Sequence, residues 1–140
     1  MGGRGKPIPE GFHTAMPRIY VKGVADAVEF YKRAFGAHEL GRAADSAGNI
    51  VSAEIRIGDS MVSLSEESPA WRNYSPQSLG GATMLITLNV EDADAVWGQV
   101  ISSGAKEIFP LEDQPYGYRQ GRLEDPFGHF WIISTRIASA

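Results

Sequence analysis

Three polar residues alternate with apolar ones in segment 50–57, and their types suit acid–base chemistry or ion recognition. The segment reads Ile50-Val51-Ser52-Ala53-Glu54-Ile55-Arg56-Ile57. Strand alternation therefore places Ser52, Glu54 and Arg56 on one face and the apolar residues on the other. On an ordinary half-buried strand this polar face is solvated. If the sheet is cupped around a cleft instead, Glu54 can act as an acid or base or recognise a cationic group.

Arg119 is a second candidate, because an arginine fork in a cleft suits a carboxylate or a phosphate group. The alternative is a structural role, in which Arg119 pairs with a nearby acid such as Glu124 or Asp125 and braces the following hairpin. Glu54 and Arg119 stand on strands at corresponding places in the two halves of the chain. A shared cleft would present both charges.

Two aromatic residues, Trp71 and Tyr74, lie in a connecting segment rich in proline, glycine and serine. They have no periodic core role there. Loops of this length are usually functional, and aromatic side chains can cover a planar or cationic ligand. The alternative is that Trp71 and Tyr74 pack against the edge of the domain.

The elements that position these residues occur twice, because the second half of the chain repeats the first. Val24-Ala25-Asp26-Ala27-Val28 returns as Asp92-Ala93-Asp94-Ala95-Val96, and Gly36 to Leu40 returns at the same offset as Gly104 to Ile108. Two copies are too few for a solenoid. They predict two similar modules packed about a pseudo-twofold axis, with a cleft where the modules meet or curl.

Hydrophobic periodicity predicts the order βαβββ in each half. In the first half we expect a helix over 25–35 and strands over 15–21, 38–43, 50–57 and 61–65. In the second half we expect a helix over 91–103 and strands over 84–90, 107–111, 118–123 and 130–136. The predicted organisation is a loosely ordered segment 1–12, a first module 13–67, a connector 68–82 and a second module 83–137.

Two motifs carry a family resemblance. Glu29-Phe30-Tyr31-Lys32-Arg33-Ala34-Phe35-Gly36-Ala37 resembles the first-helix signature of the glyoxalase/bleomycin resistance protein/dioxygenase superfamily, also called vicinal oxygen chelate proteins. The stretch from Tyr116 to Trp131, with Asp125-Pro126-Phe127-Gly128-His129 in it, resembles the terminal hairpin of PhnB-like members, and Arg119 matches the arginine of that motif. The resemblance implies an α+β fold of two βαβββ modules, whose curved mixed sheets form a cleft, usually in a homodimer. This sequence departs from PhnB-like sequences at Ser52, where they often have His.

The resemblance further implies where a metal would bind, since metal-dependent members carry ligands on the first and last strands of each module. In this sequence, the corresponding ligand positions fall near Met16, Val62, Leu85 and Ile132, and all four residues are apolar. A shift of one residue brings in no plausible ligand either. We therefore predict no metal and no other cofactor.

The three histidines do not replace these ligands. His13 precedes the first predicted strand and is interpreted as an exposed lead-in residue. His38 aligns with Lys106 in the repeat, so its position suits a surface cation. His129 follows the turn glycine Gly128, and bracing that turn by a hydrogen bond is favoured over metal ligation.

Composition excludes several function classes. The 140 residues carry a formal net charge of −4, and no basic stripe predicts a nucleic-acid surface. The absence of cysteine excludes disulfides and thiolate catalysis. No apolar run is long enough for a membrane span, and no secretory leader is evident, so a cytoplasmic protein is expected.

The leading hypothesis is a metal-independent, small-molecule-binding protein of the bleomycin-resistance type, which sequesters an antibiotic or a metabolite. Its predicted ligand-binding residues are Ser52, Glu54, Arg56, Trp71, Tyr74 and Arg119, and its predicted state is a homodimer. The alternative is an enzyme, namely a metal-dependent lyase, isomerase or dioxygenase with a non-standard ligand set such as His13 and Glu54. One fold hosts many chemistries, so the sequence leaves open whether catalysis occurs.

Overall fold

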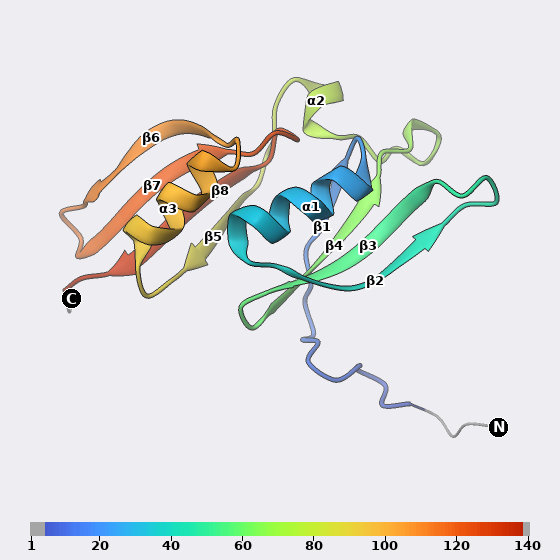
Figure 1. Ribbon diagram of the computed structural model, residues 1–140, viewed down its shortest axis with the longest axis horizontal. Helices are drawn as coiled ribbons and strands as arrows, with labels where there is room; N and C mark the ends of the chain where they lie inside the picture. The colour runs from blue at the N-terminus through green and yellow to red at the C-terminus, as the bar shows by residue number, and fades with distance from the viewer. Residues whose placement is uncertain (1–4, 139–140) are drawn as a thin grey trace.

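The structure is a computed structural model that describes residues 5–138, and its elements follow the predicted duplication (Figure 1). The first module contains β1 (Arg18–Val21), α1 (Val24–Phe35), β2 (His38–Ala44), β3 (Ile50–Ile57) and β4 (Ser60–Glu66). The connector holds a 3₁₀ turn, η1 (Pro69–Trp71), and a short helix, α2 (Pro76–Leu79). The second module contains β5 (Leu85–Asn89), α3 (Ala93–Ser102), β6 (Lys106–Asp113), β7 (Tyr118–Glu124) and β8 (Phe130–Arg136).

Each module forms one four-stranded mixed sheet. The strand orders are β1-β4-β3-β2 and β5-β8-β7-β6. The first strand of each module pairs in parallel with the last strand, and the remaining pairs are antiparallel. The predicted α+β fold with two βαβββ modules is confirmed.

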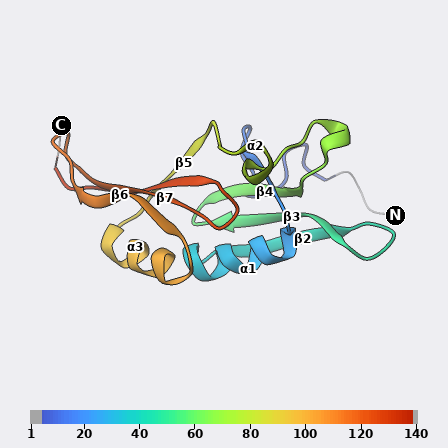
Figure 2. The same ribbon diagram turned by 90° about the horizontal axis from the view of Figure 1, so that it is seen from above.

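The two long helices cover only one side of the sheets. Figure 2 shows α1 and α3 together on that side, with the connector helix α2 on the other. The helix α1 ends at Gly36, whose left-handed conformation lets its N–H bond the Lys32 carbonyl. The helix α3 begins after Asp92, whose carboxylate accepts from the Ala95 N–H at 3.1 Å. The opposite faces of both sheets are left uncovered by these helices.

A buried hydrogen-bond network joins the modules around Asp125. The Tyr31 hydroxyl on α1 donates to one carboxylate oxygen of Asp125, and Trp131 Nε1 on β8 donates to the same oxygen at 2.8 Å. Burial, and then the charge of Asp125, raises the pKa of Tyr31 well above its usual value. His129 bonds the Tyr20 carbonyl of the first module through Nε2 at 2.8 Å. The ring of His129 therefore serves the junction between modules, whereas the sequence predicted that it braces the turn after Gly128.

The segment before β1 contains no helix or strand over residues 5–12 and runs away from the first sheet (Figure 1). The prediction of loose order for 1–12 falls in part, over residues 1–4, outside the described residues. Within residues 5–138, no helix is long and apolar enough to cross a membrane.

Candidate functional site

The uncovered face of the first sheet carries a groove with a polar lining. In β3, Ala53 and Ile55 point toward α1 and are buried, so alternation turns Ser52 and Glu54 to the uncovered face. Here we define the polar groove, of about 470 Å³, by its lining residues: Met16, Arg18, Gly41, Arg42, Ala43, Ser52, Ala53, Glu54, Ser63 and Ser65. The prediction that Ser52 and Glu54 share one surface therefore agrees with the geometry.

Strand pairing arranges the polar groove as a row across the sheet. Ser63 on β4 lies opposite Arg18 on one side and Glu54 on the other, and Glu54 lies opposite Gly41 on β2. The row presents a guanidinium, a hydroxyl and a carboxylate in sequence. Such a row can hydrogen-bond a small polar group, because it offers donors and acceptors together.

The uncovered face of the second sheet carries a more apolar groove with an arginine in it. We define the aromatic groove, of about 360 Å³, by its lining residues: Leu85, Phe109, Pro110, Glu112, Gln114, Tyr116, Gln120, Gly121, Arg122 and Ile132. Gln120 is held in place, since its Oε1 accepts from the Tyr116 hydroxyl at 2.7 Å and its Nε2 donates to Ser134 Oγ at 2.9 Å. The groove thus combines apolar walls with a few oriented polar groups, as ligand sites commonly do.

The two grooves occupy equivalent places in the repeat. Glu54 pairs with Ser63, and Arg122 pairs in the same way with Ile132. Arg18 pairs with Ser63, as Thr87 does with Ile132. The oppositely charged counterpart of Glu54 is therefore Arg122, and the expectation that Arg119 stands at this place in the repeat is wrong.

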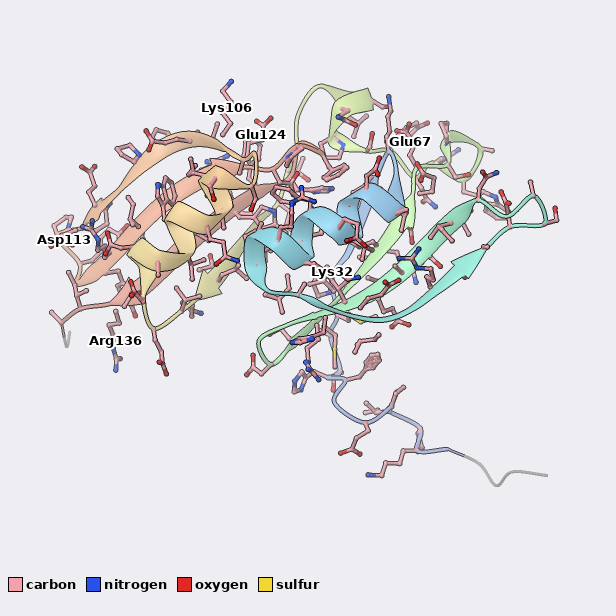
Figure 3. All side chains as sticks on the ribbon, in the orientation of Figure 1. Lys32, Glu67, Lys106, Asp113, Glu124 and Arg136 are labelled. Atoms are coloured by element: carbon pink, nitrogen blue, oxygen red, sulfur yellow. The ribbon has the colours of Figure 1, made fainter. Side chains whose placement is uncertain are left out.

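Arg119 lies on the other face of β7, where it braces α3 and β6. Its Nε and one terminal nitrogen bond both oxygens of Asp94 at 3.0 and 2.9 Å, and the other terminal nitrogen bonds Asp113 at 3.0 Å. These bonds raise the pKa of Arg119, and Arg119 lowers the pKa of Asp94. Figure 3 shows Asp113 at the outer end of the second sheet. The bracing alternative named acidic partners in the hairpin, whereas the structure supplies Asp94 and Asp113.

The remaining predicted site residues lie apart from one another. Arg56 follows Glu54 on the same face of β3, but it is exposed and is not part of the polar groove. Tyr74 lines a groove between the connector and β1, together with Tyr20. Trp71 is 81% exposed at the end of η1. The structure does not bring Trp71 or Tyr74 to the polar or the aromatic groove.

Strand pairing also corrects the residue assigned to one of the four predicted metal-ligand positions. Val62 points into the core and is 3% exposed, so it does not face the groove. The residue at this ligand position on the uncovered face is Ser63, which is the equivalent of Ile132 in the second module. Met16 and Leu85 do line the grooves. A serine hydroxyl beside apolar side chains does not match the nitrogen and carboxylate donors that divalent transition metals prefer. This donor set does not fit the metal site of the metal-dependent branch.

No other metal centre emerges from the described residues. Between residues 5 and 138, no three His, Asp or Glu side chains are grouped closely enough to share an ion. His13, named with Glu54 in the enzymatic alternative, lines a different groove, beside Met61 and Trp131. The two residues are therefore not assembled into one ligand set within the chain.

The fold is that of a known family. The sequence model of the Glyoxalase/Bleomycin resistance protein/Dioxygenase superfamily matches residues 12–133, and the chain belongs to this superfamily. An uncharacterised protein of Mycobacterium bovis is 39% identical over 124 residues, which cover 86% of this chain and 82% of the relative.

Two solved structures agree with this assignment. TioX from Micromonospora sp. ML1 is 25% identical with a TM-score of 0.72, over 89% of this chain and 99% of TioX. A gene product of Arabidopsis thaliana is 28% identical with a TM-score of 0.71, over 88% of this chain and 98% of that protein.

Proposed function

We propose that this protein binds a small organic molecule on the uncovered faces of its sheets and holds it without the help of a metal, in the manner of the bleomycin-resistance type. The observation that carries the proposal is the pair of grooves at equivalent places in the two modules, one polar and one aromatic. We further propose that the chain belongs to the PhnB-like branch, on the strength of its terminal hairpin sequence.

The dimensions and the lining of the grooves support a ligand of modest size. Volumes of about 360 and 470 Å³ fall in the range of small-molecule sites. Phe109 and Tyr116 are 59% and 58% exposed on the wall of the aromatic groove. Aromatic side chains that are this accessible offer a flat contact surface for a planar ligand.

A homodimer is part of the proposal. The polar and the aromatic groove lie on separate sheets, and no described residue lines both. Leu85 and Phe109 expose apolar surface beside the aromatic groove, and contiguous apolar surface of this kind marks interaction sites. A second copy that covers these faces would convert each open groove into an enclosed site.

The proposal is tested by mapping where small molecules bind. Isotope-labelled protein is titrated with a library of neutral and charged aromatic fragments, and backbone amide shifts are followed by NMR. We expect the shifts to cluster on β6, β7 and β8 around the aromatic groove. Phe109→Ser removes one wall and should weaken the fragments that bind by about fivefold to tenfold, the scale of one aromatic contact.

Trp71→Ser is the matched comparison, since it removes another exposed aromatic side chain, one outside both grooves. It should leave fragment affinity unchanged. Shifts confined to the helix-covered side, or an absence of any saturable binding to the library, would contradict the proposal. A loss of affinity in Trp71→Ser but not in Phe109→Ser would assign binding to the connector instead.

A further inference from the structure

Arg122 is held in the aromatic groove by ring stacking rather than by an acid. Its guanidinium carbon lies 4.4 Å from the centroid of the Phe130 ring and 5.9 Å from that of the Phe109 ring. Contacts of a cation with the face of an aromatic ring are attractive, and they orient the planar guanidinium. The rings therefore fix the direction of Arg122 without neutralising its charge.

The charge of Arg122 has no counterion in the described chain. None of the ion pairs formed within residues 5–138 includes Arg122. Its Nε is buried and finds no hydrogen-bond acceptor among those residues. A buried donor that lacks an acceptor destabilises the protein, and an acceptor on a bound ligand would relieve that cost.

The strand register determines which side chains flank Arg122. Glu124, the next acid on the same face of β7, lies opposite Lys106 in the strand register, and both are labelled in Figure 3. Arg122 instead has Phe109 opposite it on β6 and Ile132 opposite it on β8. The register thus places Phe109 and Ile132, both apolar, on the two sides of Arg122.

We infer that the ligand of the aromatic groove is a monoanionic, planar acid whose carboxylate is the counterion of Arg122. This inference rests on the proposed function. The carboxylate pairs with the guanidinium, and the planar body lies against Phe109 and Tyr116. Glu112 also lines the groove, and its negative charge disfavours a dianion such as a phosphate monoester. Gln120, oriented by Tyr116 and Ser134, offers further polar contact at the floor of the groove.

The experiment compares probes that share one ring system and differ in charge. Titrations of 2-naphthoate, 2-naphthamide and 2-naphthyl phosphate into the protein are followed by calorimetry and by NMR. We expect 2-naphthoate to bind at least about tenfold more tightly than 2-naphthamide, which is about 1.4 kcal/mol, and more tightly than 2-naphthyl phosphate. The backbone amide shifts that 2-naphthoate causes in the protein should be largest around Arg122 and Phe109.

Variants then assign the preference to one side chain. Arg122→Met should bring the ratio of the naphthoate and naphthamide affinities to about one, and Arg122→Lys, which keeps the charge and guards against misfolding, should retain part of the preference. Arg33→Met, on the exposed side of α1, removes the same charge far from the groove and should leave the ratio unchanged. Far-UV circular dichroism confirms that each variant is folded.

The outcomes separate this inference from the function on which it rests. Naphthoate and naphthamide binding equally in the aromatic groove would overturn the inference and leave small-molecule binding standing. A preference for naphthoate that survives Arg122→Met would also overturn the inference. So would a preference that is lost in Arg119→Met, since Arg119 lies on the other face of β7. If neither these probes nor any library fragment binds, both the inference and the proposed function are wrong.

Discussion

Asp125 is the residue on which the junction of the modules depends. One carboxylate oxygen accepts from Tyr31 and Trp131, and the other accepts from the backbone N–H groups of Phe127 and His129 at 2.9 and 3.0 Å. The side chain is 3% exposed. Because four donors converge on one carboxylate, its negative charge is compensated in the interior by hydrogen bonds rather than by an ion pair.

We predict that Asp125→Asn destabilises the protein by about 3 kcal/mol, since hydrogen bonds to a charged group contribute about 1.5–3 kcal/mol each. The amide nitrogen would replace an acceptor with a donor, and either orientation of the amide faces donors. Urea denaturation followed by tryptophan fluorescence measures the change in the free energy of unfolding. Asp59 lies in the corresponding turn of the first module, and its carboxylate accepts a hydrogen bond from Ser60 Oγ. Asp59→Asn should therefore change the free energy of unfolding by less than about 0.5 kcal/mol. Equal effects of the two substitutions would contradict the assigned role.

The candidate site shows what the sequence could reveal at the residue scale. Alternation in segment 50–57 located Ser52 and Glu54 on one face, and their place in the polar groove agrees with it. In β7, the same alternation puts Arg119 on the face of the buried Leu123 and turns Arg122 to the uncovered face. Motif resemblance drew attention to Arg119 instead. The signal that identifies Arg122 was thus present as a two-residue periodicity.

Among the elements, β7 and α3 pack closely because β7 carries a glycine at the contact. A Cβ on Gly121 would lie 2.6 Å from the Trp97 ring and 2.8 Å from the backbone of Leu111. Gly121 therefore allows Trp97 to rest directly on the sheet. Gly121 immediately precedes Arg122, which lies opposite Phe109 on β6.

Gly121→Ala should destabilise the protein by about 1–3 kcal/mol, the usual range for overpacking a filled interior. Gly41→Ala provides a matched control, since Gly41 lies in β2 with no atom within 4 Å of its added Cβ. This control should leave stability within about 0.5 kcal/mol of the wild type. Thermal unfolding by calorimetry measures both variants. A Gly121→Ala protein as stable as Gly41→Ala would show that Trp97 moves aside without loss.

The strands and long helices were predictable because each carries a clear hydrophobic period. The bounds of β3 and β8 match the predicted segments, and α1 begins one residue earlier than predicted. No helix was predicted in the connector, which contains η1 and α2. Their sequence signals are local: each begins with a proline, Pro69 in η1 and Pro76 in α2, and Ser75 caps α2. Elements of three and four residues are too short for periodicity to detect.

At the scale of the whole molecule, one chain leaves both sheets uncovered on the face away from α1 and α3. Met84, Leu85 and Phe109 are 44%, 41% and 59% exposed in the second module. The repeat gives the two modules equivalent uncovered faces, so a twofold assembly can bury both faces at once. The homodimer that the sequence predicts stays a prediction, and its oligomeric state in solution is the measurement that checks it.

We expect the protein without ligand to be a dimer at micromolar concentration, measured by light scattering coupled to size exclusion. Phe109→Glu introduces a charge into the apolar surface of the second sheet and should raise the dissociation constant at least about tenfold, or about 1.4 kcal/mol. Ile8→Glu changes a side chain that is 53% exposed in the segment before β1, and it should leave the constant unchanged. A wild-type monomer at about 100 μM, a concentration at which a micromolar dimer is largely associated, would rule out the dimer. A dimer that Phe109→Glu does not weaken would place the contact on another face and leave the aromatic groove open to solvent.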